Sequence, residues 1–341
     1  MNCYIANRIL IFLFFVVSLF YNDVFASILQ ISTINGIKYS YQVAISPDGD
    51  YVVVGDEDQN IVTFAKSTGK ILWTYALPDP VESASISNNG SLVVIGVQKN
   101  YVVCIAKNGT LIWQNEVNGE VPIAMTDTGN KIYAFDNYLD KLICFQNDGS
   151  ILWEKLINTS GWTVWKISVS SNGDTIMLKT NSDIIICDDL GSFYKFYDVI
   201  EGNYLADSSL SPDGTKCVVS YADGNSKKVA LIDLRLGTLW TKTVEPYSPG
   251  VEIDNQYNVY ATVTDYDNYL WDVNGTLIRT WPNGGSNIEI DNEGYRCIIG
   301  AFSEARVYEM FNKPDILWDA DDNNKWSLPD IIYGLQVLSI K

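Results

Sequence analysis

Short apolar stretches alternate with polar turns along most of the chain, in a pattern that repeats about every 40 residues. In the first repeat this alternation predicts four strands, at Gln42–Ser46, Tyr51–Gly55, Ile61–Ala65 and Ile71–Tyr75. The stretches are rich in Val, Ile, Tyr and Phe, which favour strands. Outside the first 26 residues no stretch shows the periodicity of an amphipathic helix. The chain is therefore predicted to be all-β.

Two further signals recur in phase within these repeats. One is a Gly-x-x-x-Trp pattern that begins at Gly69, Gly109 and Gly149, at intervals of 40 residues, and weakens in later repeats. The other is a turn rich in Asp, Asn and Gly between the first two strands, such as Ser46–Gly49 and Ser211–Gly214. Four short strands in each repeat of this length are typical of a β-propeller blade.

These signals predict a β-propeller of seven four-stranded blades, with the ring closed by strands from both ends of the chain. Ile28–Ile34 resembles the fourth strand of a repeat, and Ile331–Lys341 adds one or two strands after the seventh. The count is either seven with extra closing strands or eight with one hybrid blade. Residues 27–341 are expected to form one domain, because each blade buries its faces only against its neighbours.

The first 26 residues have the features of a secretory signal peptide. Arg8 precedes an apolar run over Ile9–Phe20, and Val24 and Ala26 supply small residues before a cleavage site. The run is short for a transmembrane helix, which needs about 20 residues; an uncleaved anchor is the alternative. We expect a secreted protein, extracellular or periplasmic, with no membrane insertion after signal cleavage.

The composition excludes several classes of function. Histidine is absent, which removes Ser-His-Asp and Cys-His catalysis and histidine-bound metals. The formal net charge of −18 argues against nucleic acid as a partner. Of six cysteines, Cys3 leaves with the signal, and the others are expected to be buried thiols. A disulfide between Cys217 and Cys297 is the open alternative.

The segment Ala65–Trp73, which reads AKSTGKILW, resembles the repeat of pyrroloquinoline-quinone-type propellers, and Asp233–Trp240 is similar to it. The Ser-Pro-Asp-Gly turns that begin at Ser46 and Ser211 resemble those of WD40-type propellers. The resemblance covers about residues 28–323 and implies the fold. It carries over no catalytic residue and no cofactor, because the chain is shorter than the quinone enzymes and has no Cys-Cys pair. The closer analogy is with short secreted members, assembly scaffolds among them.

Tryptophan recurs at one position of the repeat. This regularity favours packing between blades over an aromatic platform for a ligand. In the resembling propellers the tryptophan after the Thr-Gly turn docks between blades. The tryptophans assigned to blade docking are Trp73, Trp113, Trp153, Trp240 and Trp318.

The loops contain candidate sites for a metal ion and for glycans. We expect no bound metal; the segment that best resembles a calcium site holds Asp319, Asp321 and Asp322, and no EF-hand spacing is present. Four Asn-x-Ser/Thr sequons would accept glycans in a secreted protein: Asn89, Asn108, Asn158 and Asn274.

The connections between strands distinguish the two ends of the propeller. Turns after the first and third strands are short and uniform, whereas the other connections vary, as at Ala222–Lys228 and Asp319–Lys325. Variable loops on a rigid frame usually carry binding, and Tyr and Trp are common interface anchors. Aromatic residues of these connections are the predicted partner-binding face, with blade packing or lining of the channel mouth as the alternative: Tyr138, Trp162, Trp165, Tyr247, Tyr266 and Trp281.

The sequence thus predicts a secreted, non-catalytic propeller that acts as an interaction scaffold for a protein or an extracellular polysaccharide. One alternative is a propeller enzyme, either a quinone-dependent dehydrogenase or a lyase or hydrolase. Glycoside hydrolysis would need two carboxyl groups about 5–9 Å apart, and nothing in the sequence singles out such a pair. The other alternative is a scaffold for an envelope assembly.

Overall fold

The computed structural model describes residues 28–37, 42–56, 58, 60–198, 204–244, 246–247 and 249–310. By its internal contacts the chain divides into two units. One unit, Gln30–Tyr308, holds the blades. The other consists of Met1–Leu29 and Glu309–Lys341, and only its residues 28, 29, 309 and 310 are described.

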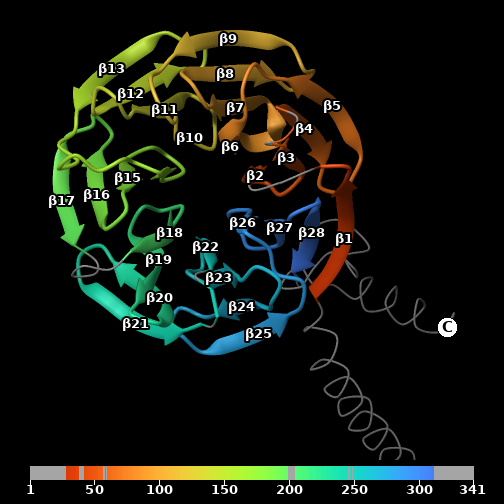
Figure 1. The fold of residues 1–341 in the computed structure, drawn as a ribbon, viewed down its shortest axis with the longest axis vertical. Helices are drawn as coiled ribbons and strands as arrows, with labels where there is room; N and C mark the ends of the chain where they lie inside the picture. Colours follow the sequence, from red (N-terminus) through yellow and green to blue (C-terminus); the bar gives the residue numbers. More distant parts are fainter. Residues whose placement is uncertain are drawn as a thin grey trace, which may run out of the picture. The chain divides into compact units, whose positions relative to one another are not determined.

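Seven four-stranded antiparallel sheets form a ring, as the sequence predicts (Figure 1). The described residues contain one short 3-10 turn, η1 (Asn88–Gly90), and no α-helix. Blade 1 consists of β2 (Gln42–Ile45), β3 (Tyr51–Asp56), β4 (Ile61–Lys66) and β5 (Ile71–Ala76). Blade 2 consists of β6 (Val81–Ile86), β7 (Leu92–Val97), β8 (Tyr101–Ala106) and β9 (Leu111–Glu116). Blade 3 consists of β10 (Ile123–Met125), β11 (Lys131–Asp136), β12 (Lys141–Gln146) and β13 (Ile151–Leu156).

The remaining blades follow in chain order around the ring. Blade 4 consists of β14 (Lys166–Val169), β15 (Thr175–Lys179), β16 (Asp183–Asp188) and β17 (Phe193–Asp198). Blade 5 consists of β18 (Leu205–Leu210), β19 (Lys216–Asp223), β20 (Ser226–Asp233) and β21 (Gly237–Thr243). Blade 6 consists of β22 (Gly250–Ile253), β23 (Val259–Thr262), β24 (Asn268–Trp271) and β25 (Leu277–Trp281). Blade 7 consists of β26 (Asn287–Ile290), β27 (Arg296–Gly300), β28 (Glu304–Met310) and β1 (Ile28–Asn35).

Blade 7 is a hybrid that joins the two ends of the described chain. Its outermost strand is β1, which lies beside β28, red next to blue in Figure 1. The prediction that Ile28–Ile34 acts as a fourth strand is therefore confirmed, and the count is seven blades. The closing strands expected at Ile331–Lys341 lie outside the described residues, as do Trp318 and the calcium candidates Asp319, Asp321 and Asp322.

The core consists of apolar layers that neighbouring blades share. In one such cluster Phe64 of β4 and Ile95 of β7, both fully buried, belong to blades 1 and 2. The fourth strands are more exposed: β5, β9 and β13 alternate between exposed and half-buried positions. A blade thus has no complete core of its own, which is why the ring must close to cover its last faces.

The repeated tryptophans bridge adjacent blades at the third turn of the next blade. Trp73 Nε1 donates to Lys107 O at 2.9 Å, and Trp113 Nε1 donates to Asn147 O at 2.9 Å. Trp240 makes the same contact with Val273 O at 3.0 Å. Only glycine fits in the turn beneath the indole ring of the repeated tryptophan, since a Cβ on Gly149 would lie 2.7 Å from Trp113 Cγ.

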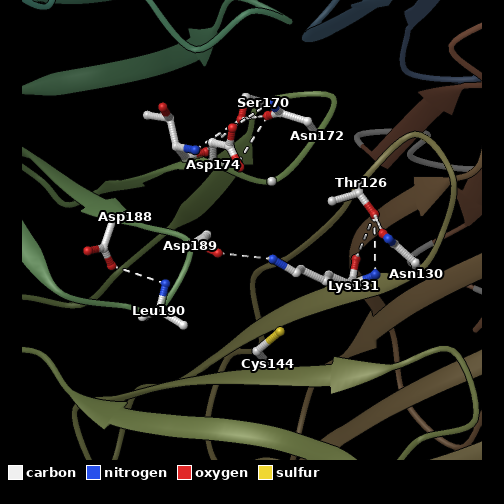
Figure 2. A network of polar contacts seen from close by, with 12 residues as sticks. Thr126, Asn130, Lys131, Cys144, Ser170, Asn172, Asp174, Asp188, Asp189 and Leu190 are labelled. Carbon is white, nitrogen blue, oxygen red and sulfur yellow. Dashed lines mark hydrogen bonds and ion pairs between the residues drawn. The ribbon is translucent and has the colours of Figure 1, made fainter.

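Polar side chains hold the uniform turns together. Figure 2 shows this for blades 3 and 4: Thr126 Oγ1 donates to Asn130 Oδ1 at 2.6 Å and accepts from Lys131 N at 3.2 Å. The Lys131 ammonium reaches Asp189 in the third turn of blade 4, with Nζ 3.4 Å from Oδ2. These turns therefore fix the relative position of neighbouring blades.

Candidate functional site

The antiparallel topology gives the ring two different ends. The turns after the first and third strands of each blade lie at one end, the turn face; the other connections lie at the opposite end, the loop face. The first strands of the blades surround a central cavity of about 520 Å³. This cavity and the loops around its mouth form the candidate functional site.

Hydrogen bonds join the first turn of every blade to that of the next blade and tie the turn face into a belt. Five of these are between backbone atoms: Asn88 N to Asp127 O, Asp127 N to Ser171 O, Ser171 N to Pro212 O, Asn255 N to Asn292 O, and Asn292 N to Pro47 O. Side chains complete the belt where Asn89 N donates to Asp48 Oδ2 at 2.8 Å and Tyr257 Oη donates to Asp213 Oδ2 at 2.7 Å.

Three of these turns also meet across the channel. Asn292 Nδ2 of blade 7 donates to Asp127 Oδ2 of blade 3 at 2.6 Å and to Ser171 Oγ of blade 4 at 3.2 Å. All three residues line the cavity, so they form its floor at the turn face. Burial raises the pKa of Asp127, although hydrogen bonds from Ser171 and Asn292 act in the opposite direction. These contacts narrow the cavity at the turn face.

A charged cluster lines the cavity. Lys166, the first residue of β14, extends its ammonium to carboxylates of the next three blades. Its Nζ lies 3.2 Å from Asp207 Oδ1, 3.2 Å from Glu252 Oε1 and 3.9 Å from Glu289 Oε1. Ser209 Oγ donates to Glu252 Oε2 at 2.5 Å. One ammonium thus faces three carboxylates, and the cluster as a whole is acidic.

The electrostatics of this cluster follow from burial and from the close carboxylates. Burial disfavours the charged form of Lys166, but Asp207, Glu252 and Glu289 outweigh it and raise the pKa of that ammonium. Burial and then the neighbouring Glu252 carboxylate raise the pKa of Glu289 well above its ordinary value. The protein therefore favours a charged lysine here and disfavours full ionisation of the acids.

A second lysine lies at the mouth of the cavity. Lys179 pairs in register with Lys166 across β14 and β15, and only 5% of its surface is exposed. Burial lowers its pKa to about 8. Its Nζ faces the Tyr204 ring, 5.9 Å from the centroid, and makes no hydrogen bond or ion pair within the described part of the chain.

Sequence analysis missed these charges, although a signal was present. Glu252 and Glu289 occupy the same place in the short first strands β22 and β26, which read GVEI and NIEI. An acid inside an apolar inner strand is unusual, because that strand otherwise packs against its neighbours. Aligning the first strands of the repeats would have found these two acids, but not Lys179, which lies in a second strand.

The predicted aromatic residues gather on the loop face with one exception. The side chains of Tyr138, Trp162, Trp165, Tyr247 and Tyr266 lie in loop-face connections and are 77, 46, 40, 57 and 47% exposed. Tyr247 and Tyr266 come together, with ring centroids 5.9 Å apart. Trp165 lines the cavity mouth, where the unpredicted Tyr204 is also 56% exposed. Trp281 is 6% exposed and packs edge-on against Tyr308, so it has little surface to offer a partner.

The remaining candidate sites are placed as follows. The sequon residues Asn89, Asn108, Asn158 and Asn274 are all exposed. In the described residues no group of three or more acids or cysteines is arranged to hold a metal ion. The described cysteines are buried and free, so no disulfide joins Cys217 to Cys297. None of the described helices is long and apolar enough to span a bilayer.

Comparisons with known proteins agree with the fold and add little about activity. Residues 93–231 match the model of a family of unknown function, DUF5711. Among solved structures, the chain is similar to Kuenenia stuttgartiensis hydrazine synthase, with a TM-score of 0.66 and 15% identity over 79% of this chain and 94% of that chain. At that identity the likeness shows the fold alone. No curated protein matches the chain. The resemblance to quinone-type and WD40-type propellers stays a prediction.

Proposed function

We propose that the loop face is a non-catalytic recognition surface that binds another protein. The observation that carries the proposal is that the exposed aromatic side chains of the described residues gather in connections of one face. Tyr and Trp anchor interfaces because they bury a large area at a low cost in conformational entropy. The face therefore offers several separate anchors on a frame that the turn-face belt holds rigid.

Charge favours a basic partner surface. The chain has a formal net charge of −18, and acids outnumber lysines in the central cavity that opens on this face. A partner with basic residues would be steered toward the cavity mouth, since complementary potentials raise association rates. An extracellular polysaccharide, the other partner class suggested by the sequence, is a competing outcome of the test below.

Capture from native extracellular fluid tests the face assignment. A loop-face variant, W162A/Y247A, removes two exposed anchors; a turn-face control, L190A/L236A, removes side chains that are 57 and 82% exposed. We expect the wild type and the control to retain one protein partner equally, and the loop-face variant to retain at least about tenfold less, or roughly 1.4 kcal/mol. The affinities of the three proteins for that partner, once it is purified, must follow the same order.

Equal capture by all three proteins, or loss in the turn-face control, would contradict the assignment. Retention of a glycan with no protein would contradict the proposal that the partner is a protein, but would not contradict the assignment of the binding face. Circular dichroism of each variant establishes that the fold survives.

Secretion is part of the same proposal. The apolar segment and cleavage pattern in residues 1–26 support it. The buried thiols are compatible with an oxidising compartment, because burial raises the pKa of Cys104, Cys187 and Cys217 to about 12 and keeps the reactive thiolate scarce. Intact-mass measurement of the native protein should give a chain that begins at Ser27; a chain that retains the apolar segment would contradict cleavage.

A further inference from the structure

Two charged side chains on the cavity wall, Lys179 and Glu289, have no close group of opposite charge. Lys179 is 95% buried, and its ammonium makes no hydrogen bond or ion pair in the described part of the chain. Glu289 has one ion pair, with Lys166 Nζ at 3.9 Å, whereas Asp207 and Glu252 both lie 3.2 Å from the same nitrogen. An unpaired buried charge such as the Lys179 ammonium is costly. The Glu289 side chain is 28% exposed and has only this distant ion pair, so it too would gain from a partner of opposite sign.

The other charges of the cluster are satisfied within the protein. Asp207 accepts a hydrogen bond from Val251 N at 2.9 Å in addition to its ion pair, and Glu252 accepts from Ser209 Oγ. Glu82, another acid on the wall, accepts from Gln98 Nε2 at 3.1 Å. The unmatched groups are therefore one cation and one anion, on different blades of the same cavity.

The cavity has the size and shape of a small-molecule site. Its volume of about 520 Å³ is within the usual range for such pockets. The contact of Asn292 with Asp127 crosses it at the turn face and narrows that end. Trp165 and Tyr204 stand at the open end and supply apolar surface over a polar interior. A ligand would enter from the loop face and be held by groups on opposite walls.

We propose that this cavity binds a small zwitterionic amino carboxylate, whose ammonium group pairs with Glu289 and whose carboxylate pairs with Lys179. A ligand with only a positive charge would leave Lys179 unmatched. A ligand with only a negative charge would face the Asp207, Glu252 and Glu289 carboxylates. A zwitterion satisfies both groups and adds no net charge to the cavity. The site shares Trp165 with the loop face but includes neither residue changed in the loop-face variant, and the proposal goes beyond that function.

Calorimetric titration of the mature chain with defined probes tests the inference. Glycine, 4-aminobutyrate and 6-aminohexanoate vary the separation of the two charges, while hexylamine and hexanoate keep one charge each. We expect at least one amino carboxylate to bind and to raise the melting temperature. Both single-charge analogues should bind at least about tenfold more weakly than 6-aminohexanoate if that is the preferred length.

Variants assign the two ends of the ligand. K179M and E289Q should each weaken binding of the preferred amino carboxylate by about tenfold or more, and K70M, at an exposed lysine of the turn face, should leave it unchanged. If hexylamine binds as tightly as the preferred amino carboxylate, and K179M does not change its binding, the cavity is a simple cation site and the proposal is overturned. Failure of all three amino carboxylates to bind the wild type would also overturn it, and needs no variant to fold. Neither result bears on the loop-face anchors.

Discussion

At the scale of single residues, Lys179 links stability to pH. Its pKa in the folded protein is about 8, below the value of about 10.4 for an unperturbed lysine. When folding lowers the pKa of a lysine, the unfolded chain binds the proton more tightly than the folded protein, and this difference destabilises the folded state. The penalty is at its full size at any pH below the folded pKa. The penalty decreases as the pH rises from about 8 and is gone above about 10.4.

Replacing this lysine with methionine should therefore stabilise the protein in a pH-dependent way. We expect K179M to raise the free energy of unfolding by about 3 kcal/mol at pH 7. The difference from wild type should shrink toward zero by about pH 10.5. Urea titrations of both proteins at several pH values measure it, with K70M as the exposed control. A gain that stays constant with pH would show that packing, and not charge, is responsible.

The same scale shows what sequence reasoning could and could not find. The tryptophans and the turn glycines were visible because packing repeats them in every blade. Glu252 and Glu289 could be noticed only as acids in apolar first strands, and their contact with Lys166 could not be predicted, because it depends on which strand of each repeat faces the axis and which blades lie opposite. Trp281 illustrates the converse: its type and loop position suggested an anchor, but Tyr308 from blade 7 covers it. Contacts between blades decided both cases.

At the scale of elements, local chemistry placed the strands closely. The strands predicted at Gln42–Ser46 and Ile61–Ala65 are observed at Gln42–Ile45 and Ile61–Lys66. Apolar alternation and Gly or Asp turns act within a few residues, so they can be read from the sequence directly. The number of blades could not be fixed in that way, since it depends on pairing between β1 and β28 at opposite ends of the chain.

The closing strand β1 should contribute to the stability of the whole ring. Ile34 is 2% exposed and belongs to the cluster that blades 7 and 1 share, whereas its neighbour Asn35 is exposed. We expect I34A to lower the free energy of unfolding by about 2–4 kcal/mol through lost burial and a cavity. N35A should change it by less than about 0.5 kcal/mol. Urea unfolding followed by tryptophan fluorescence compares them; equal effects would mean that β1 does not close the ring.

At the scale of the whole molecule, the two ends of the ring differ in structure. Hydrogen bonds connect the first turns of all neighbouring blades at the turn face. The loop face carries the exposed aromatics and the entrance to the charged cavity. A rigid belt at one end allows the loops at the other end to vary without loss of the frame. Substitutions at the contact across the channel floor, between blades 7 and 3, can test whether this contact stabilises the ring.

Asn292 and Asp127 provide that test. In N292D two carboxyl groups would face each other at the floor, so one of them must take up a proton. The folded pKa of that group would rise further above its unfolded value, and the folded state would then bind more protons than the unfolded state at neutral pH. Stability should fall as the pH rises through that pKa, with a loss of about 1–3 kcal/mol at pH 7 that is recovered near pH 4.

The reciprocal double variant separates this contact from any general effect of substitution. D127N/N292D again places one amide opposite one carboxylate, so it should regain most of the stability that N292D loses at pH 7. Thermal and urea unfolding of the wild type, both single variants and the double variant give the interaction energy as a double-mutant cycle. Additive losses would show that the two side chains do not meet across the channel. Recovery would show that residues 165 positions apart in sequence jointly hold the floor of the cavity in which the ligand is proposed to bind.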